Sequence, residues 1–187
     1  MPLLALGERS VNEPKQGRQA HMGMSVTISA AAEADAERIL KLQYLCYQSE
    51  AELYGDYSIE PLTQSLDDLR AELGRGCVLV ARLGEEVVGS VRASVGADGT
   101  ADITGLIVHP RMQRHGLGGR LLAAIEERLA GEWSAKRYRL ATGQRSEGNL
   151  RLYRKWGYER TGTEQVSRVL TRITLEKDAP AALATTA

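Results

Sequence analysis

The sequence predicts one α/β domain built on a mixed, mostly antiparallel sheet. Strand-like runs rich in apolar and β-branched residues alternate with stretches whose apolar residues recur at helical spacing. Three of the strand runs follow one another through short glycine-containing turns, as antiparallel strands do. The length of 187 residues, with 43% hydrophobic and 26% charged residues, suits a single globular domain.

The first elements are a strand at 25–30 and a helix over Asp35–Glu50, where apolar side chains recur every three or four residues. A loop is expected after this helix. Leucines at 62, 66, 69 and 73 recur at helical spacing and predict a second helix that ends near Gly74, with Ser65 and Asp68 available as a capping box.

The middle of the chain predicts a meander of three antiparallel strands. The turns at 84–86 and 96–99 contain the glycines that tight turns require. The expected strands are Cys77–Leu83, Val87–Val95 and Ala101–His109.

Beyond Pro110 helices and strands alternate, which completes the order β-α-α-β-β-β-α-β-α-β. Gly131 is expected to close the first of these helices and Ser146 to cap the second. The expected elements are a helix from Gly116 to Gly131, a strand Tyr138–Ala141, a helix Glu147–Trp156 and a final strand Val166–Leu175.

The domain is expected to span residues 25–177. Residues 1–24 show neither helical nor strand periodicity and predict a disordered leader, or a segment introduced by cloning. Residues 178–187 predict a disordered tail.

Charge and composition exclude several classes of protein. The 24 basic and 24 acidic residues give a net charge of zero, which argues against a nucleic-acid-binding protein. No apolar run approaches the roughly 20 residues of a membrane span. Cys46 and Cys77 stand apart, without a CxxC pair or a histidine cluster, so we expect no metal site and two reduced, buried thiols in a cytoplasmic protein.

A basic, glycine-rich turn that opens the helix after Pro110 predicts an anion-binding site. A helix N-terminus presents free backbone N–H groups and the positive end of its dipole, and glycines allow a phosphate to approach them. A P-loop would need Gly-Lys-Ser/Thr at its end, and the dinucleotide fingerprint would need GxGxxG; neither fits. The turn contains Arg111, Arg114, His115, Gly116, Gly118 and Gly119.

The segment Gln113–Gly118 resembles the Q/R-x-x-G-x-G/A element of the GNAT acetyltransferases, which binds the pyrophosphate of acetyl-coenzyme A. Leu106–Pro110 resembles the fourth strand of that family, and Glu147–Tyr153 with Gly157-Tyr158 resembles its later helix and strand. The resemblance covers 26–177 and implies the GNAT fold, with about seven strands flanked by four helices. It also implies acetyl-coenzyme A as co-substrate.

The resemblance implies which residues bind the coenzyme. In the fourth strand, backbone N–H groups left unpaired by a splay would face the thioester, and Gly105 could permit that distortion. The coenzyme-binding residues so implied are Leu106, Ile107, Val108, Gln113, Arg114, His115, Gly116, Leu117, Gly118, Gly119, Asn149 and Tyr153.

Acetyl transfer to an amine needs a base, oxyanion stabilisation and protonation of the departing thiolate. Tyr153 matches the general acid of the family and lies one helical turn beyond Asn149. Asp102 lies near the position where some members carry a glutamate base, although it could equally end the preceding hairpin. Glu50, Glu52 and Asp56 are alternative bases.

The segment Ser49–Glu60 is expected to line the acceptor site through Glu50, Glu52, Tyr54 and Asp56, or else to be a solvated acidic loop. Such a loop would suit a cationic amine: a small primary amine, either an antibiotic or a metabolite, is the expected acceptor, and a peptide N-terminus or lysine is the rival. Neither cysteine has a histidine nearby, which favours direct transfer in a ternary complex over a thioester intermediate.

Three further expectations concern partners. The stretch 136–155 holds seven basic residues and one acidic residue, a net charge of +6 that suits the phosphates of coenzyme A. A non-catalytic coenzyme-binding regulator on the same fold is the alternative function. A homodimer formed through edge strands is expected from the family.

Overall fold

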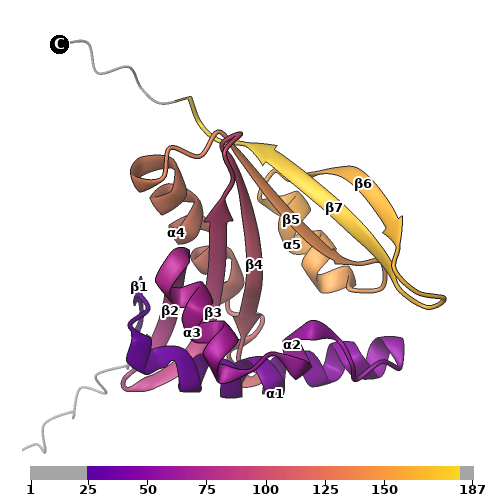
Figure 1. Ribbon diagram of the computed structural model, residues 1–187, viewed down its shortest axis with the longest axis horizontal. Coiled ribbons are helices and arrows are strands. Elements are labelled where there is room, and N and C mark those ends of the chain that lie inside the picture. Colours follow the sequence, from indigo (N-terminus) through magenta and orange to yellow (C-terminus); the bar gives the residue numbers. More distant parts are fainter. Residues whose placement is uncertain (1–24, 182–187) are drawn as a thin grey trace, which may run out of the picture.

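A computed structural model describes residues 25–181. Its centre is one seven-stranded sheet in the order β1-β2-β3-β4-β5-β7-β6, in which only β4 and β5 pair in parallel (Figure 1). The strands are β1 (Val26–Ala30), β2 (Cys77–Leu83), β3 (Glu86–Val95), β4 (Thr100–Val108), β5 (Arg137–Gly143), β6 (Glu159–Gln165) and β7 (Thr171–Asp178).

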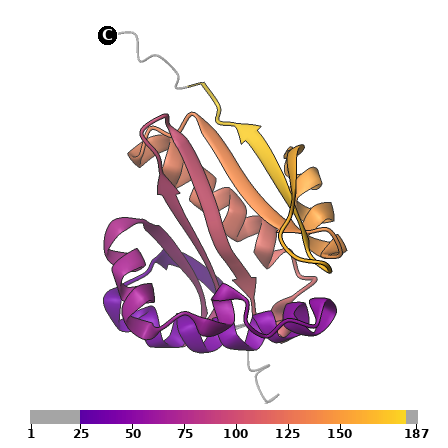
Figure 2. The same ribbon diagram turned by 45° about the vertical axis from the view of Figure 1, so that its right-hand side comes forward.

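Helices cover both faces of the sheet. One face is packed against α1 and α3, and the other against α4 and α5, as the two buried clusters show. Figure 2 shows α1 lying across the ends of β2, β3 and β4. The helices are α1 (Ala36–Tyr54), α2 (Glu60–Thr63), α3 (Leu66–Arg75), α4 (Leu117–Glu132) and α5 (Glu147–Lys155), with 3-10 turns η1 (Glu33–Asp35) and η2 (Pro110–Met112).

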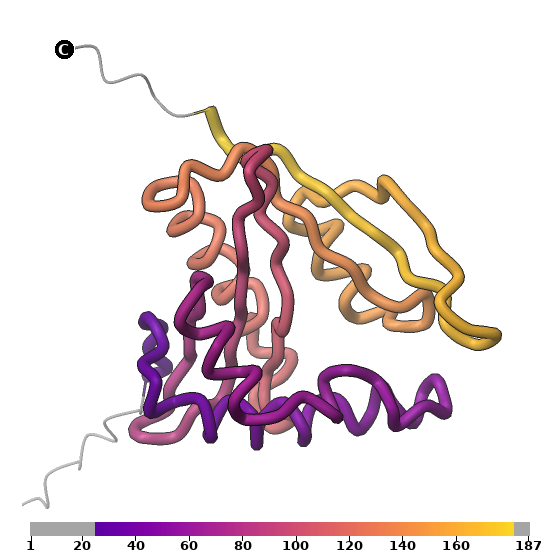
Figure 3. The backbone as a smooth tube through the Cα atoms, in the orientation of Figure 1, coloured from indigo at the N-terminus to yellow at the C-terminus, as the bar shows by residue number. Residues whose placement is uncertain are grey.

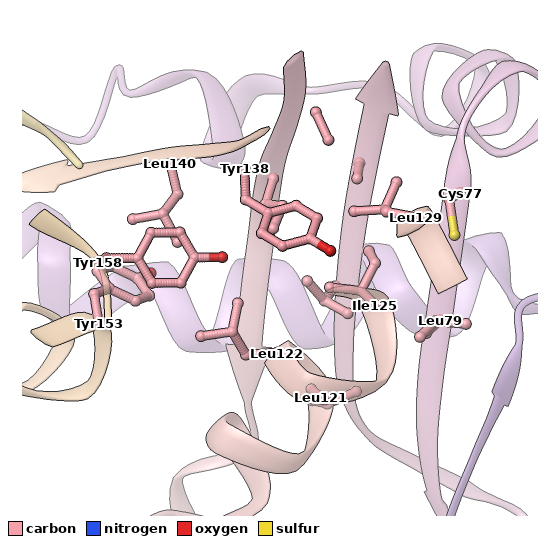
Figure 4. Close-up of a cluster of buried hydrophobic side chains, with 14 of the residues drawn as sticks. Cys77, Leu79, Leu121, Leu122, Ile125, Leu129, Tyr138, Leu140, Tyr153 and Tyr158 are labelled. Carbon is pink, nitrogen blue, oxygen red and sulfur yellow. The ribbon is translucent and has the colours of Figure 1, made fainter. Parts of the chain in front are cut away.

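The larger buried cluster joins α4 and α5 to the sheet (Figure 4). Leu121, Leu122 and Ile125 of α4 are fully buried, while Tyr153 and Tyr158 lie at one end of the cluster. The rings of these two tyrosines pack at a centroid distance of 6.1 Å. This packing fixes α5, and Tyr153 with it, against the sheet.

Most of the predicted elements are confirmed. The meander β2-β3-β4 forms with the expected short turns, and Gly84 and Gly99 adopt the positive φ angles that these turns require. The capping box at the start of α3 is also present, with Ser65 Oγ accepting from the backbone N–H of Asp68 at 3.2 Å.

The predicted final strand Val166–Leu175 is wrong. Two strands, β6 and β7, form a hairpin whose turn occupies 166–170, as the backbone trace in Figure 3 shows. Six of the seven side chains of β6 are exposed, so its sequence lacks the alternation of a half-buried strand. β1 and β6 are the two edge strands, and the dimer expected at such edges stays a prediction.

The helices differ from the sequence prediction in four places. The leucine repeat of the predicted second helix is divided, because Leu62 lies in the short α2 and the other three leucines lie in α3. The first helix continues past Glu50 to Tyr54, so half of the expected acceptor loop is helical. Gly131 lies inside α4, which ends at Glu132. Ser146 precedes α5 but its side chain makes no capping hydrogen bond.

The predicted domain boundaries at 25 and 177 lie within the described residues. The expected leader 1–24 and the end of the expected tail, 182–187, lie outside them. The last strand runs one residue past the expected boundary at 177. Within residues 25–181, no helix combines the length and apolar character needed to cross a membrane.

Candidate functional site

β4 and β5 diverge. Their parallel ladder holds for three residue pairs, the last being Asp102 with Arg139, and then ends (Figure 2). β4 continues to Val108 while β5 turns away toward β7, which pairs with it along its whole length. The last six residues of β4 therefore have a strand partner only on the β3 side.

A bulge in β4 accompanies the divergence. Arg92 of β3 pairs with Thr104, but Ser90 pairs with Ile107, so two residues of β4 face one residue of β3. Gly105 lies in this bulge with φ = +57°, a left-handed conformation that favours glycine. The expected local distortion at Gly105 is thus confirmed.

The backbone of Val108 faces the open side of β4. The N–H of His109 donates to Val88 of β3 at 2.8 Å, and successive backbone N–H groups of a strand point in opposite directions. The carbonyl of Val108 accepts from Gln113 Nε2 at 3.0 Å and from Cys46 Sγ at 3.4 Å. These side chains bind where the next strand would otherwise pair, while Ile107 is buried against α1 and α3.

The glycine-rich turn lies directly beyond β4, at the open end of the divergence (Figure 1). Gly116 has φ = +78° and is the N-cap of α4, and nothing lies within 4 Å of the position of an added Cβ. Arg114 also has a positive φ, of 64°. Backbone N–H groups in such alternating conformations can converge on an anion.

Two of the basic residues of the turn are free to meet an anion, and one is not. Arg114 and His115 are exposed, and the His115 ring hydrogen-bonds the carbonyl of Gln113 at 2.8 Å. Arg111 instead forms an ion pair with Glu86. The side chain of Leu117 belongs to the core, so only its backbone can contact a ligand.

The next two glycines serve the packing of α4 against α5. A Cβ on Gly118 would lie 3.3 Å from Leu152, and a Cβ on Gly119 would lie 2.7 Å from Trp156 Nε1. Gly119 is buried, so the absence of its side chain is explained by Trp156 rather than by a phosphate.

Gly119→Ala tests this packing. We expect it to lower the free energy of unfolding by about 1 to 2 kcal/mol, because overpacking the Trp156 contact outweighs the gain in helix propensity. Gly131→Ala, in the same helix with open space around it, is expected to raise stability by up to about 1 kcal/mol. Urea unfolding measures the change in the free energy of unfolding for both variants. Equal changes would contradict a packing role for Gly119.

Tyr153 and Asn149 lie on α5, beside the end of β5. Asn149 is exposed and donates from Nδ2 to Thr142 Oγ1 of β5 at 3.2 Å. Tyr153 is 6% exposed. Burial raises its pKa, and the nearby Tyr47 and Glu50 raise it further. This phenol therefore stays protonated at neutral pH.

Glu50 is a partly buried carboxylate of α1, and burial raises its pKa. Its charge raises the pKa of both Tyr47 and Tyr153. Tyr47 is also on α1. The charge of Arg92 lowers its pKa and the charge of Glu60 raises it. Because Cys46 contacts Val108 of β4 and Tyr54 contacts Arg145 beyond β5, the part of α1 that carries Tyr47 and Glu50 crosses the gap between these strands.

The other predicted acceptor residues have different surroundings. Tyr54 is buried, and its hydroxyl accepts from the backbone N–H of Arg145 at 2.8 Å, which ties α1 to the end of β5. Glu52 is exposed on α1. Asp56 accepts from the backbone N–H and the hydroxyl of Ser58 at 2.8 and 2.6 Å, which lowers its pKa.

Asp102 lies where the ladder between β4 and β5 ends. Its two carboxylate oxygens accept from Arg139 Nε and Nη2 at 2.6 and 2.8 Å. This bidentate pair joins the two strands just before they separate. Asp102 is thus engaged with Arg139, whereas the charge of Glu50 raises the pKa of Tyr153.

An acidic hollow of about 390 Å³ lies between α2 and α3, on the α1 side of the sheet. Burial raises the pKa of Glu60 in its wall. The hollow is lined by Glu60, Thr63, Gln64, Asp68, Ala71, Glu72 and Arg75.

Sequence reasoning missed two residues near this site. Arg92 is 7% exposed in the middle of β3, and Tyr47 lies beside Glu50. A lone arginine within the apolar run 87–95 was the available signal for Arg92. Tyr47 gave no such signal, because an aromatic residue at helical spacing is usual in a core.

Comparison with known proteins agrees with this geometry. Residues 37–158 match the model of the acetyltransferase (GNAT) family. No curated protein sequence matches the chain. Solved structures are similar in fold at low identity, the GNAT-family acetyltransferase of Streptococcus pneumoniae among them, with 17% identity, TM-score 0.70 and coverage of 83% of this chain and 100% of that one.

Two further structures have similar values. The PaiA N-acetyltransferase of Thermoplasma acidophilum, solved with coenzyme A, is 19% identical with TM-score 0.69, over 83% of this chain and 99% of that one. The ribosomal-protein-S18-alanine N-acetyltransferase of Escherichia coli is 15% identical with TM-score 0.69, over 87% and 99%. The family match spans well over half of the sequence, and the chain belongs to the GNAT family of acetyltransferases.

Proposed function

We propose that this acetyltransferase moves the acetyl group of acetyl-coenzyme A to the primary amine of a small cationic molecule, directly and within a ternary complex. The observation that carries the proposal is the end of the β4–β5 ladder at Asp102, followed by the bulge at Gly105. It leaves the backbone of Val108 on an open strand edge, near a protonated buried phenol and a partly buried carboxylate.

The residues present suit the coenzyme. The open space at Gly116 and the positive φ angles of Arg114 and Gly116 suit close approach of a pyrophosphate to backbone N–H groups. Val108 offers a backbone edge to an extended arm. The structure of PaiA, which shares the fold, was solved with coenzyme A.

Acetyl-coenzyme A supplies a thioester with an electrophilic carbon and a thiolate leaving group. In our proposal Glu50, whose pKa is raised by burial, takes the proton that the attacking amine loses. The Val108 N–H donates toward the carbonyl oxygen, where negative charge develops. Tyr153 gives its proton to the sulfur as the carbon–sulfur bond breaks, and Asn149 helps to position the coenzyme.

The charge around α1 and α2 supports a cationic acceptor. Glu50 and Glu60 are both partly desolvated carboxylates whose pKa is raised, and such groups favour a nearby ammonium. Asp56 is engaged with Ser58, and the hydroxyl of Tyr54 with Arg145, so we assign neither to the acceptor.

The state of the cysteines supports direct transfer over a thioester intermediate. Cys46 hydrogen-bonds the carbonyl of Val108 and is therefore near the proposed thioester site. Burial raises the pKa of its thiol to about 11, so it carries almost no thiolate at neutral pH. Cys77 is buried in the core, and burial raises its pKa too.

The test is thiol release from acetyl-coenzyme A with a panel of small amines, diamines and peptides, with mass spectrometry of the products. We expect acetylated small amines in amounts equal to the thiol released. Turnover on peptides alone would overturn the choice of acceptor. Tight coenzyme binding with no turnover on any amine would favour a regulatory protein.

A further inference from the structure

Arg92 is a buried cation in the centre of β3. Its guanidinium donates to the side-chain oxygens of Gln43 at 3.0 Å and Gln64 at 3.3 Å, and forms an ion pair with Glu72 at 3.3 Å. Burying an arginine is costly, and replacing buried ion pairs by apolar groups is often neutral or stabilising. Stability alone therefore does not explain an arginine here.

The partners of Arg92 come from three helical segments. Gln43 belongs to α1, Gln64 follows α2 and Glu72 belongs to α3. They are also joined to one another, because Gln43 donates to Gln64 at 2.9 Å and Gln64 donates to Glu72 at 2.6 Å. One guanidinium thus connects α1, the segment after α2, and α3.

The same α1 face continues from Gln43 to the proposed base. Tyr47 and Glu50 lie four and seven residues further along, at the spacing that places side chains on one side of a helix. Holding Gln43 therefore fixes the rotation of α1 and the direction in which Glu50 projects.

The other side of the guanidinium lies against the bulge of β4. A Cβ on Gly105 would come within 2.7 Å of Arg92 Nε and 2.8 Å of Nη2. Arg92 Nε is buried without a hydrogen-bond partner among the described residues, as is the hydroxyl of Ser90, two positions earlier on β3. The close contact with Gly105 is thus made at the cost of a hydrogen bond.

We propose that Arg92 is a positioning residue, which fixes α1, α2 and α3 to the bulge at Gly105 and so sets Glu50 against the thioester-facing edge of β4. The inference rests on the proposed function. Arg92 contacts neither the coenzyme nor the amine in this role; it determines how far apart the base and the strand edge are held.

The test compares Arg92→Lys with Arg82→Lys. Arg82, on β2, also holds a buried partner: its Nη2 donates to both carboxylate oxygens of Asp35, at 2.6 and 2.7 Å. Lysine keeps the charge in both cases and loses the planar fork. For Arg92→Lys we expect kcat/KM for the amine to fall about 10- to 100-fold, since small misplacements of reacting groups have such effects. We expect the Kd of acetyl-coenzyme A to change less than twofold.

Arg82→Lys is expected to lose similar stability and to keep kcat/KM within about twofold, because its pair with Asp35 touches neither α1 at Gln43 nor the bulge. Equal losses of activity in the two variants would overturn the proposal, as would an Arg92→Lys enzyme of undiminished activity.

Hydrogen exchange gives a readout that does not depend on turnover. Arg92→Lys should speed amide exchange in residues 104–108 and in 43–64 together, and Arg82→Lys should not. Unchanged exchange in these segments would contradict the positioning role. If the unaltered protein acetylates no amine, the proposed function fails, and exchange still decides whether Arg92 joins the helices to the bulge.

Discussion

Tyr153→Phe is expected to lower kcat by about 10²- to 10⁴-fold, the range that general acid catalysis contributes. The variant removes one hydroxyl and leaves the ring in its contact with Tyr158. A phenol whose pKa is raised by burial stays protonated at neutral pH and has a proton to give when the thiolate departs. The Kd of acetyl-coenzyme A should change little. Steady-state kinetics measures the fall in kcat, and calorimetry measures the Kd.

Tyr158→Phe is the matched control. The Tyr158 hydroxyl donates to the buried Glu126 at 2.7 Å, and Glu126 also accepts from Lys177 at 2.6 Å. Its removal should cost about 1 to 3 kcal/mol of stability, the penalty for a lost buried hydrogen bond, while kcat stays within about threefold. If Tyr153→Phe were as active as Tyr158→Phe, the role of general acid would be refuted.

Glu50→Gln is expected to lower kcat/KM for the amine by about 10²- to 10⁴-fold at neutral pH, because a base that accepts the amine proton is lost. Glu52→Gln, two residues away on the exposed side of α1, should leave kcat/KM unchanged. A similar loss in both variants would indicate that the total charge of the helix, and not a base at Glu50, supports the reaction.

The pH dependence separates Glu50 from the amine itself. An amine with a pKa near 10 makes log(kcat/KM) rise by about one per pH unit at neutral pH. Below the pKa of Glu50, which burial raises, the slope should approach two, since the base must also be deprotonated. In Glu50→Gln the slope should stay at one throughout. A parent enzyme with a slope of one down to acid pH would argue against Glu50.

The contribution of Glu50 to the free energy of unfolding should fall as the pH rises, whereas kcat/KM rises. The folded state raises the pKa of Glu50 and so favours its protonated form, which contributes stability that is present below the unfolded-state pKa. This contribution is lost as the pH rises through the folded-state pKa. Glu50→Gln should therefore unfold at an equal or higher urea concentration than the parent at pH 7, although it is less active.

Elements whose signals are local could be predicted from the sequence. The strands β2, β3 and β4 are apolar and joined by turns that specify an antiparallel pairing, and Ser65 with Asp68 marks a helix start in four residues. The glycine-rich turn was recognisable for the same reason, since Gly116 must adopt a positive φ within that turn.

What the sequence concealed depends on contacts between distant residues. Strand β6 is exposed on nearly every residue, and its pairing with β7 defines it more than its own composition does. Asp102 could not be matched with Arg139 before the parallel pairing of β4 and β5 was known. The cluster around Arg92 joins residues up to 49 positions apart in the sequence.

Direct transfer requires that both ligands are bound together where β4 and β5 diverge. A matrix of initial rates of thiol release tests this requirement, with acetyl-coenzyme A and the amine varied together and the acetylated amine quantified. We expect double-reciprocal lines that intersect and one acetylated amine for each thiol released. Parallel lines, with an acetylated protein formed before the amine is added, would contradict it.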